Sequence, residues 1–187
     1  MGDEIGRAAV IGVSFGGFVA LRFAAIHPGL VDKLVLLVSA HRFSPEGQRR
    51  IAAQITALEA GDLYGLVRDN AVLFRRPWYN WLVRLRYLRR KGRFAAEFND
   101  PASIARAYRA LFSTDFERNG AYAARIGAET LVIGGTADQF FGRDDFEETA
   151  RLIPRARLEL FEGERHMLPV ERRRDVAGLL ADFLSRS

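Results

Sequence analysis

Three side chains in the sequence are of the types that together activate a serine for attack on a carbonyl carbon. Ser14 lies between Gly12 and Gly16, directly after an apolar run, and Asp138 and His166 follow much later in the chain. A serine hydroxyl is a poor nucleophile until a base takes its proton, and that base needs an acid to orient it. The sequence therefore contains a candidate nucleophile, acid and base, in that order.

The residues around Ser14 predict the element that positions it. A short apolar run rich in β-branched residues predicts a buried strand over Ala8–Val13, and apolar residues at helical spacing predict a helix over Phe15–Ile26. Lys33–Ser39 predicts a second buried strand. Strand, helix and strand within about thirty residues form a βαβ unit, and hence a parallel sheet. Ser14 then lies on a sharp strand-to-helix turn, where flanking glycines avoid a collision.

The rest of the chain divides into a helical stretch and a second βαβ unit. Between His41 and about Gly127 the sequence predicts only helices, broken by glycines and prolines. Strands are predicted again at Thr130–Ile133 and Arg157–Phe161, and helices at Asp144–Leu152 and Pro169–Leu184. The predicted fold class is α/β, a parallel sheet of about four strands with an inserted helical cap. The core comprises residues 1–40 and 128–187, and the cap comprises 41–127.

This arrangement brings the three candidate residues to one edge of the sheet. Asp138 follows the strand at Thr130–Ile133, and His166 follows the strand at Arg157–Phe161. Ser14 follows the first strand. All three lie beyond the carboxyl ends of parallel strands, where such folds place their sites.

The chain resembles the C-terminal two-thirds of an α/β-hydrolase with a helical cap. The resemblance rests on the Gly-x-Ser-x-Gly turn, on His27-Pro28, on the Gly135–Asp138 turn and on the Gly163–His166 loop. It implies Ser14 as nucleophile, His166 as general base, Asp138 as its orienting acid, and the Phe15 N–H as one donor of the oxyanion hole. In this family a loop upstream of the nucleophile supplies the second donor. No residue here matches that loop.

Other residues have alternative interpretations. His27 is interpreted as a helix-terminal histidine and His41 as a residue at the pocket mouth, while Asp144 and Asp145 resemble acids of a helix N-terminus. The glycines around Ser14 lack the spacing of a dinucleotide-binding loop, and no acid ends the next strand to hold a ribose. A dinucleotide site is therefore not expected.

The predicted cap carries aromatic residues and arginines. Trp78, Trp81 and several leucines share one helical face, and arginines occupy the rest. A basic helix of this kind can lie on a membrane. The preferred interpretation is a cap helix that packs its apolar face over the site and turns its arginines to water. We then expect Phe74, Trp78, Tyr79 and Trp81 to form an apolar substrate pocket.

The composition restricts the other partners and cofactors. The 187 residues carry 28 Lys and Arg against 23 Asp and Glu, a net charge of +5. Nearly all the cations are arginine, and no recognition motif accompanies them, so nucleic acid is not an expected partner. Without cysteine there is no disulfide, thiolate metal site or cysteine nucleophile, and no ligand cluster suggests a metal or organic cofactor. The first residues do not form a signal peptide, so a cytoplasmic protein without a membrane partner is expected.

The expected activity is hydrolysis of an ester, thioester or related acyl bond of a small apolar substrate, through an acyl-enzyme on Ser14. Acyl transfer or C–C bond hydrolysis would use the same residues. Since so little sequence precedes Ser14, the first strand is expected to be an open edge of the sheet. The chain is then a fragment of a longer hydrolase, a subunit that pairs through this edge in a homodimer or two-chain enzyme, or a non-catalytic remnant that binds an apolar ligand.

Overall fold

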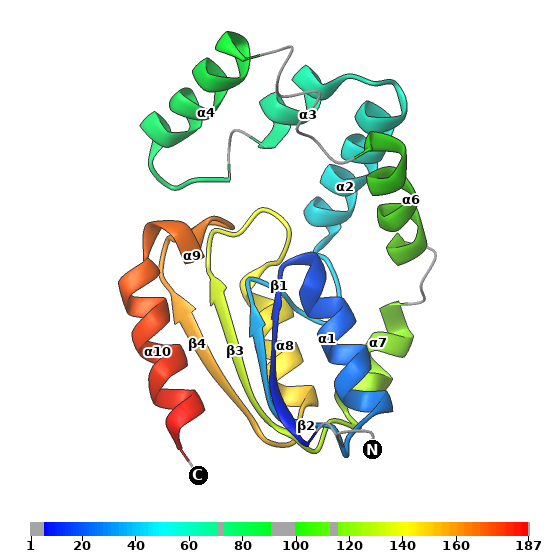
Figure 1. Ribbon diagram of the computed structural model, residues 1–187, viewed down its shortest axis with the longest axis vertical. Coiled ribbons are helices and arrows are strands. Elements are labelled where there is room, and N and C mark those ends of the chain that lie inside the picture. The colour runs from blue at the N-terminus through cyan, green and yellow to red at the C-terminus, as the bar shows by residue number, and fades with distance from the viewer. Residues whose placement is uncertain (1–5, 71–72, 91–99, 113–115, 187) are drawn as a thin grey trace, which may run out of the picture.

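A computed structural model describes residues 6–70, 73–90, 100–112 and 116–186. At its centre is a four-stranded parallel sheet (Figure 1). The strands lie in sequence order: β1 (Ala8–Val13), β2 (Val31–Leu37), β3 (Glu129–Gly135) and β4 (Ala156–Phe161). The predicted fold class, an α/β structure with a parallel sheet, is confirmed.

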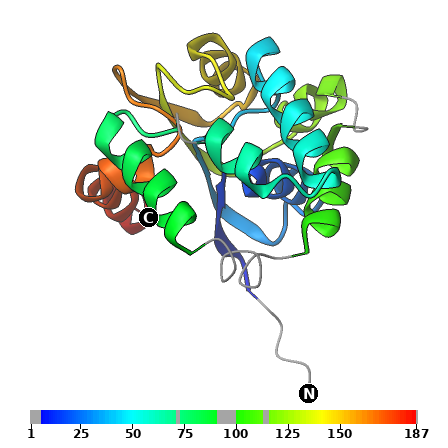
Figure 2. The same cartoon turned by 90° about the horizontal axis from the view of Figure 1, so that it is seen from above.

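Helices cover both faces of the sheet (Figures 1 and 2). One face carries α1 (Phe15–Ile26), α7 (Phe116–Ala123) and α8 (Arg143–Leu152), and the other carries α9 (Leu168–Glu171) and α10 (Arg173–Ser185). Each face of the sheet has its own apolar core, and alternate residues of β2 point into one or the other. Leu34 and Leu36 belong to the core with α1 and α8, and Val35 and Leu37 belong to the core with α10. Burial on both faces explains why this strand is a continuous apolar run.

A buried lysine connects the sheet to the last helix. Lys33, on β2, is 6% exposed, and its Nζ donates to the carbonyl of Phe183 at 2.8 Å and to that of Arg186. The last carbonyls of a helix have no partner within the helix and form the negative end of its dipole. Lys33 therefore satisfies the carboxyl end of α10 and fixes it against the sheet.

Strand β1 forms one edge of the sheet, and among the described residues its pairing partner is β2 alone. Ile11 and Val13 lie beside Val35 and Leu37, on the face that α10 covers further along the sheet. They are nevertheless 45% and 46% exposed. The structure thus has an apolar strip on β1 that no described helix covers.

The cap helices lie above the carboxyl ends of the strands (Figure 1). They are α2 (Pro45–Glu59), α3 (Leu63–Asn70), α4 (Pro77–Arg89) and α6 (Pro101–Phe112). Helix α2 packs against α3 and α6, and α4 packs against α3. Helix α7 also falls within the predicted cap range, but it packs beside the sheet, against α1 and α8. No strand occurs between β2 and β3 in the part of the chain that the structure describes.

Several predicted boundaries differ from the structure: the strand predicted over Thr130–Ile133, for example, spans Glu129–Gly135. Two of these differences have a local cause. The strand predicted over Lys33–Ser39 spans Val31–Leu37, because Val38 adopts a positive φ of 46° that ends the extended conformation. The helix predicted over Pro169–Leu184 is divided at Arg172, whose φ of −114° and ψ of 33° are not helical. Pro169 lies in the first turn of α9, as expected for a residue without an N–H.

The turn between β1 and α1 requires glycine at two positions, and they are not the two that flank the serine. A Cβ on Gly12 would lie 2.6 Å from the Gly16 carbonyl oxygen and from the Gly17 Cα, and one on Gly17 would lie 2.1 Å from Ser39 Oγ. A Cβ on Gly16 would meet nothing within 4 Å. The expected collision therefore holds for Gly12 and is wrong for Gly16, because the first turn of α1 points its second residue into open space.

These two glycines form a matched pair for mutation. Gly12→Ala should lower the free energy of unfolding by about 1–3 kcal/mol, because backbone atoms of α1 must move. Gly16→Ala should leave it unchanged or raise it by up to about 1 kcal/mol, because alanine restricts the unfolded chain. Urea unfolding of the two variants measures the difference. Equal destabilisation would contradict the steric assignment.

Candidate active site

Ser14 occupies the junction of β1 and α1. Its φ is 51°, a left-handed conformation that is uncommon for a residue other than glycine, and α1 begins at the next residue. The backbone is anchored on both sides of the turn, since Ser14 N–H donates to the Leu37 carbonyl and Gly17 N–H donates to the Ser14 carbonyl. Such strain persists where the surrounding structure imposes it, and it often marks a functional site.

The structure brings Ser14, His166 and Asp138 into one hydrogen-bonded chain. Ser14 Oγ lies 2.8 Å from His166 Nε2, and His166 Nδ1 lies 2.8 Å from Asp138 Oδ2. An ionised carboxylate can only accept, so we assign the proton to Nδ1. Nε2 is then an acceptor for the serine hydroxyl. This is the arrangement in which a histidine can take the proton of a nucleophilic serine.

Backbone groups fix the Asp138 carboxylate. Its side chain is fully buried, and Oδ1 accepts hydrogen bonds from the N–H groups of Phe140 at 2.8 Å and Phe141 at 3.3 Å. Oδ2 remains for His166. Each oxygen of the carboxylate therefore has a defined partner, as a buried charge requires.

The loops that carry the acid and the histidine are bonded to each other. Ala137 N–H donates to the Glu164 carbonyl at 3.0 Å, and Gly163 N–H donates to Thr136 Oγ1 at 2.8 Å. Gly135 allows the two loops to approach, since a Cβ there would lie 2.3 Å from the Glu164 carbonyl oxygen. The spacing of Asp138 and His166 thus follows from the backbone as well as from their own hydrogen bond.

Ser14 and His166 open onto an apolar cavity of about 240 Å³. Phe15, Phe43 and Phe140 follow strands β1, β2 and β3 in the chain, and the cap helices and the segment before α4 contribute Ile51, Gln54, Leu73 and Tyr108. Phe140 also meets the His166 imidazole edge-on, with 4.7 Å between ring centroids. Burial raises the pKa of the Tyr108 phenol, which keeps its hydroxyl protonated. A cavity of this kind fits a small, largely apolar group.

The aromatic residues predicted for the pocket lie elsewhere. Phe74, Trp78 and Trp81 are not among the lining residues, and the two tryptophans are 52% and 62% exposed. Helix α4 instead buries Tyr87, on the side away from Trp78. The ring centroid of Tyr87 lies 5.8 Å from that of Tyr64 on α3. The expectation that α4 packs its tryptophan face over the site is therefore wrong. Sequence periodicity located apolar positions on this helix but did not decide which side packs.

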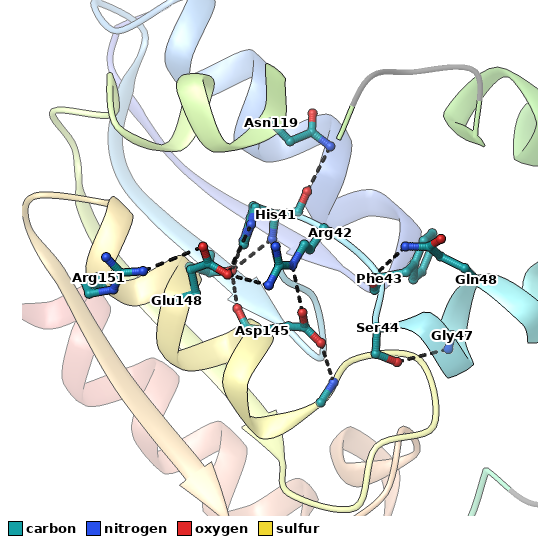
Figure 3. A network of polar contacts seen from close by, with 12 residues as sticks. His41, Arg42, Phe43, Ser44, Gly47, Gln48, Asn119, Asp145, Glu148 and Arg151 are labelled. Atoms are coloured by element: carbon teal, nitrogen blue, oxygen red, sulfur yellow. Dashed lines mark hydrogen bonds and ion pairs between the residues drawn. The ribbon is translucent and has the colours of Figure 1, made fainter. Parts of the chain in front are cut away.

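His41 does not line the pocket either. It is 4% exposed and lies against α8, with Nδ1 2.8 Å from Thr149 Oγ1. Its backbone carbonyl accepts from Asn119 of α7 at 2.9 Å (Figure 3). The prediction that His41 lies at the pocket mouth is corrected: its backbone N–H and its imidazole both bond Thr149 of α8 instead.

Charged side chains surround His41. Arg42 bonds Asp145 at 3.0 Å and Glu148 at 2.6 Å, and Glu148 Oε2 lies 4.0 Å from His41 Nε2 (Figure 3). Asp145 also accepts from the Gly142 N–H at the start of α8, in agreement with its expected position at a helix N-terminus. Burial lowers the pKa of His41, with Arg42 and Arg151 acting in the same direction and Glu148 and Asp145 opposing them.

The other predicted residues fall where the sequence placed them. Phe15 is the first residue of α1, so its N–H belongs to the groups that a helix leaves without an internal acceptor. His27 caps the carboxyl end of α1, where its N–H donates to the Phe23 carbonyl at 2.8 Å.

The described residues hold no group of three or more potential metal ligands. Among these same residues, no helix has the length and apolarity needed to cross a membrane.

Sequence reasoning missed most of the pocket wall. Phe43 and Phe140 follow the carboxyl ends of β2 and β3, so their position in sequence could have indicated them. Gln54 and Tyr108 lie on cap helices α2 and α6, where no comparable rule applies.

Comparison with known proteins assigns the family. A family model described as the alpha/beta hydrolase fold matches residues 4–172. The chain belongs to the α/β-hydrolase family. In its geometry the Ser14 turn resembles a feature of this family, the strained strand-to-helix turn that exposes a serine at the top of the sheet.

Individual relatives agree with this assignment. The chain is 32% identical to a 2-hydroxymuconate semialdehyde hydrolase of Pseudomonas sp. (strain CF600), with 98% of this chain and 64% of the relative covered. It is 24% identical to an sn-1-specific diacylglycerol lipase of Danio rerio, with 97% and 58% covered. The solved enol-lactonase of Burkholderia xenovorans LB400 has the same fold, with a TM-score of 0.79 at 21% identity over 98% of this chain and 67% of that one. The chain thus spans less than two-thirds of the length of these two curated relatives.

The buried His41 should make the α/β-hydrolase core acid-sensitive. In the unfolded chain a histidine has a pKa of about 6.5, and the folded value is lower. Between the two values the unfolded chain binds more protons. The free energy of unfolding should therefore fall as the pH decreases below about 6.5, by at most about 1.4 kcal/mol per pH unit.

His41→Gln tests this dependence. The variant should lose less stability than the wild type between about pH 7.5 and 5.5 in urea titrations. His27→Gln, which removes an exposed histidine, is the control for the substitution. A pH dependence in His41→Gln equal to that of the wild type would show that His41 does not carry the effect.

Proposed function

We propose that this chain carries the catalytic residues of a serine hydrolase that cleaves an ester, thioester or related acyl bond through an acyl-enzyme on Ser14. The observation that carries the proposal is the hydrogen-bonded chain from Ser14 through His166 to Asp138, with its serine end at an apolar cavity. Family membership supports hydrolysis as the class of reaction.

The geometry suggests how the reaction proceeds. His166 Nε2 takes the hydroxyl proton as Ser14 Oγ bonds to the carbonyl carbon, and Asp138 stabilises the imidazolium that forms. The tetrahedral intermediate collapses as Nε2 gives the proton to the departing oxygen or sulfur. Water, deprotonated by the same nitrogen, then attacks the acyl-enzyme and releases the acid. Each proton taken by His166 is returned in the following step, so no other reactant is required.

The oxyanion of the tetrahedral intermediate needs hydrogen-bond donors. We assign the Phe15 N–H to this role, because it lies at the positive end of the α1 dipole next to Ser14. In other family members a loop upstream of the nucleophile adds a second donor. A site with one donor in place of two turns over about 10²–10³ times more slowly.

The cavity lining supports a small, uncharged acyl group as the substrate. Its walls are aromatic and aliphatic, and Gln54 and Tyr108 are the polar contributions from the cap. Among the described lining residues there is no arginine or lysine, so a carboxylate bound here would lack a cation. We therefore favour short esters or thioesters of apolar acids.

A second candidate is hydrolysis of a C–C bond. The relative that is 32% identical is named for 2-hydroxymuconate semialdehyde, a substrate class with a carboxylate. The same three residues would serve this chemistry. The absence of a cation from the described pocket wall favours the ester, and parallel assays of a p-nitrophenyl ester and of a muconate semialdehyde decide between the two.

Ser14→Ala should abolish the activity. Turnover of p-nitrophenyl butyrate should fall by at least about a thousandfold, because the acyl-enzyme cannot form. A fluorophosphonate probe should label the wild type on Ser14 and leave the variant unlabelled. Ser185→Ala is the control, since Ser185 lies at the end of α10, where its hydroxyl donates to the Asp182 carbonyl.

Two results would contradict the proposal. Full ester turnover by Ser14→Ala would place the nucleophile elsewhere. A folded wild-type chain that neither turns over esters nor reacts with the probe would leave a binding protein for apolar ligands as the alternative.

A further inference from the structure

Residues 73–76, which we call the entry segment, connect the pocket to helix α4. Leu73 lines the pocket beside Ser14 and His166, and Arg76 is the N-cap of α4. The segment has no regular secondary structure, so its position depends on the bonds it makes with other parts of the chain. Three of these bonds lead to Met167 and Glu171, which follow His166, and one leads to Glu164, which precedes it.

Glu171 of α9 holds the backbone of the entry segment. Its Oε2 accepts from the Arg75 N–H at 2.7 Å, and its Oε1 accepts from the Arg76 N–H at 3.1 Å. These N–H groups lie at the positive end of α4, where a carboxylate is favourable. Both oxygens of Glu171 therefore bind one short stretch of the cap.

Two further contacts connect the segment to the histidine loop. The Met167 N–H, next to His166, donates to the Leu73 carbonyl at 3.1 Å. Arg75 donates to Glu164 Oε1 at 2.8 Å, and Glu164 is only 2% exposed. Arg172 reaches the same oxygen at 3.3 Å, so two guanidinium groups balance this buried charge.

Helix α4 also holds the segment through Asn80. The Asn80 side-chain amide bonds the Phe74 N–H and carbonyl, at 3.2 and 3.1 Å. Each backbone N–H between Phe74 and Arg76 thus has a side-chain acceptor, and two of the three are satisfied by Glu171. Loss of Glu171 would leave the Arg75 and Arg76 N–H groups without this acceptor, and the segment would be held on the histidine loop through Met167 and Glu164.

We propose that Glu171 is a positioning residue for substrate selection, which holds the entry segment on the histidine loop so that Leu73 closes the pocket at a fixed place beside His166. The inference rests on the proposed function for its kinetic consequences and on geometry alone for the attachment itself. Glu171 does not touch the reacting atoms. It acts through Leu73, which lines the pocket and thereby limits the size of the acyl group.

The attachment can be measured without substrate. The chain has two tryptophans, Trp78 and Trp81, and both lie on α4 directly after the entry segment. Glu171→Ala should lower their fluorescence anisotropy and increase acrylamide quenching, because α4 gains freedom. Glu147→Ala removes an exposed glutamate of α8 and should leave both signals unchanged. Unchanged signals in Glu171→Ala would overturn the proposal.

The preference of the site for one acyl length can be measured with p-nitrophenyl esters of increasing acyl length. Glu171→Ala should raise KM for the preferred ester about tenfold and reduce the preference for it over longer esters by a similar factor, with kcat changed less than about threefold. Glu171→Gln, which keeps one accepting oxygen, should fall between the alanine variant and the wild type. A uniform fall of kcat with the preference intact would assign Glu171 a structural role only and overturn the proposal.

Leu73→Ala separates two effects, that of the pocket wall on acyl-length preference and that of the attachment on the freedom of α4. It should reproduce the loss of acyl-length preference and keep the wild-type anisotropy. If Glu171→Ala fails to fold, as judged by circular dichroism, Glu171→Gln and Leu73→Ala carry the test. If the wild type turns over no ester, the proposed function fails, whereas the anisotropy still decides whether Glu171 holds the cap.

Discussion

The close approach of β1 and α1 is the constraint on which the site depends. Gly12 and Gly17 leave no space for a side chain between the strand, the helix and Ser39, so the chain reverses within the single residue Ser14. This reversal forces the positive φ of Ser14 and directs its hydroxyl out of the sheet, toward the loops that follow β3 and β4. It also places the free N–H groups of the helix beside the hydroxyl. The proposed nucleophile and the proposed anion site are therefore consequences of one packing contact.

The other half of the site depends on backbone contacts between neighbouring loops. Strands β3 and β4 are adjacent and parallel, so their carboxyl ends deliver Asp138 and His166 to the same edge. Gly135 allows the loops to approach, and the Glu164 carbonyl accepts from Ala137 where they meet. Glu164 serves twice, since its backbone binds the acid's loop and its side chain binds Arg75 of the cap. Core and cap thus meet at the residue that lies two before the histidine.

The sequence was sufficient to predict which three candidate residues come together, but it was insufficient to predict which residues line the pocket. In a parallel sheet all strands end at the same edge, so the order of strands in sequence already places Ser14, Asp138 and His166 together. The cap has no such rule. Helix α4 has apolar residues on more than one side, and contact with Tyr64 of α3, rather than periodicity, decides that Tyr87 packs and Trp81 does not. The prediction for His41 was wrong for the same reason, because its partners Thr149 and Asn119 lie on helices distant in sequence.

Lys33 determines where the chain leaves the fold. Its bonds to the carbonyls of Phe183 and Arg186 keep the end of α10 at the amino ends of the strands (Figure 1). The pocket is lined by Ser14 and His166, which follow the carboxyl ends of β1 and β4. A solid support attached through residue 186 would therefore lie at the amino ends of the strands. Immobilised in this way, the protein would present its pocket and cap to the bulk solution, which is the orientation that a flow reactor or a surface-based binding measurement requires.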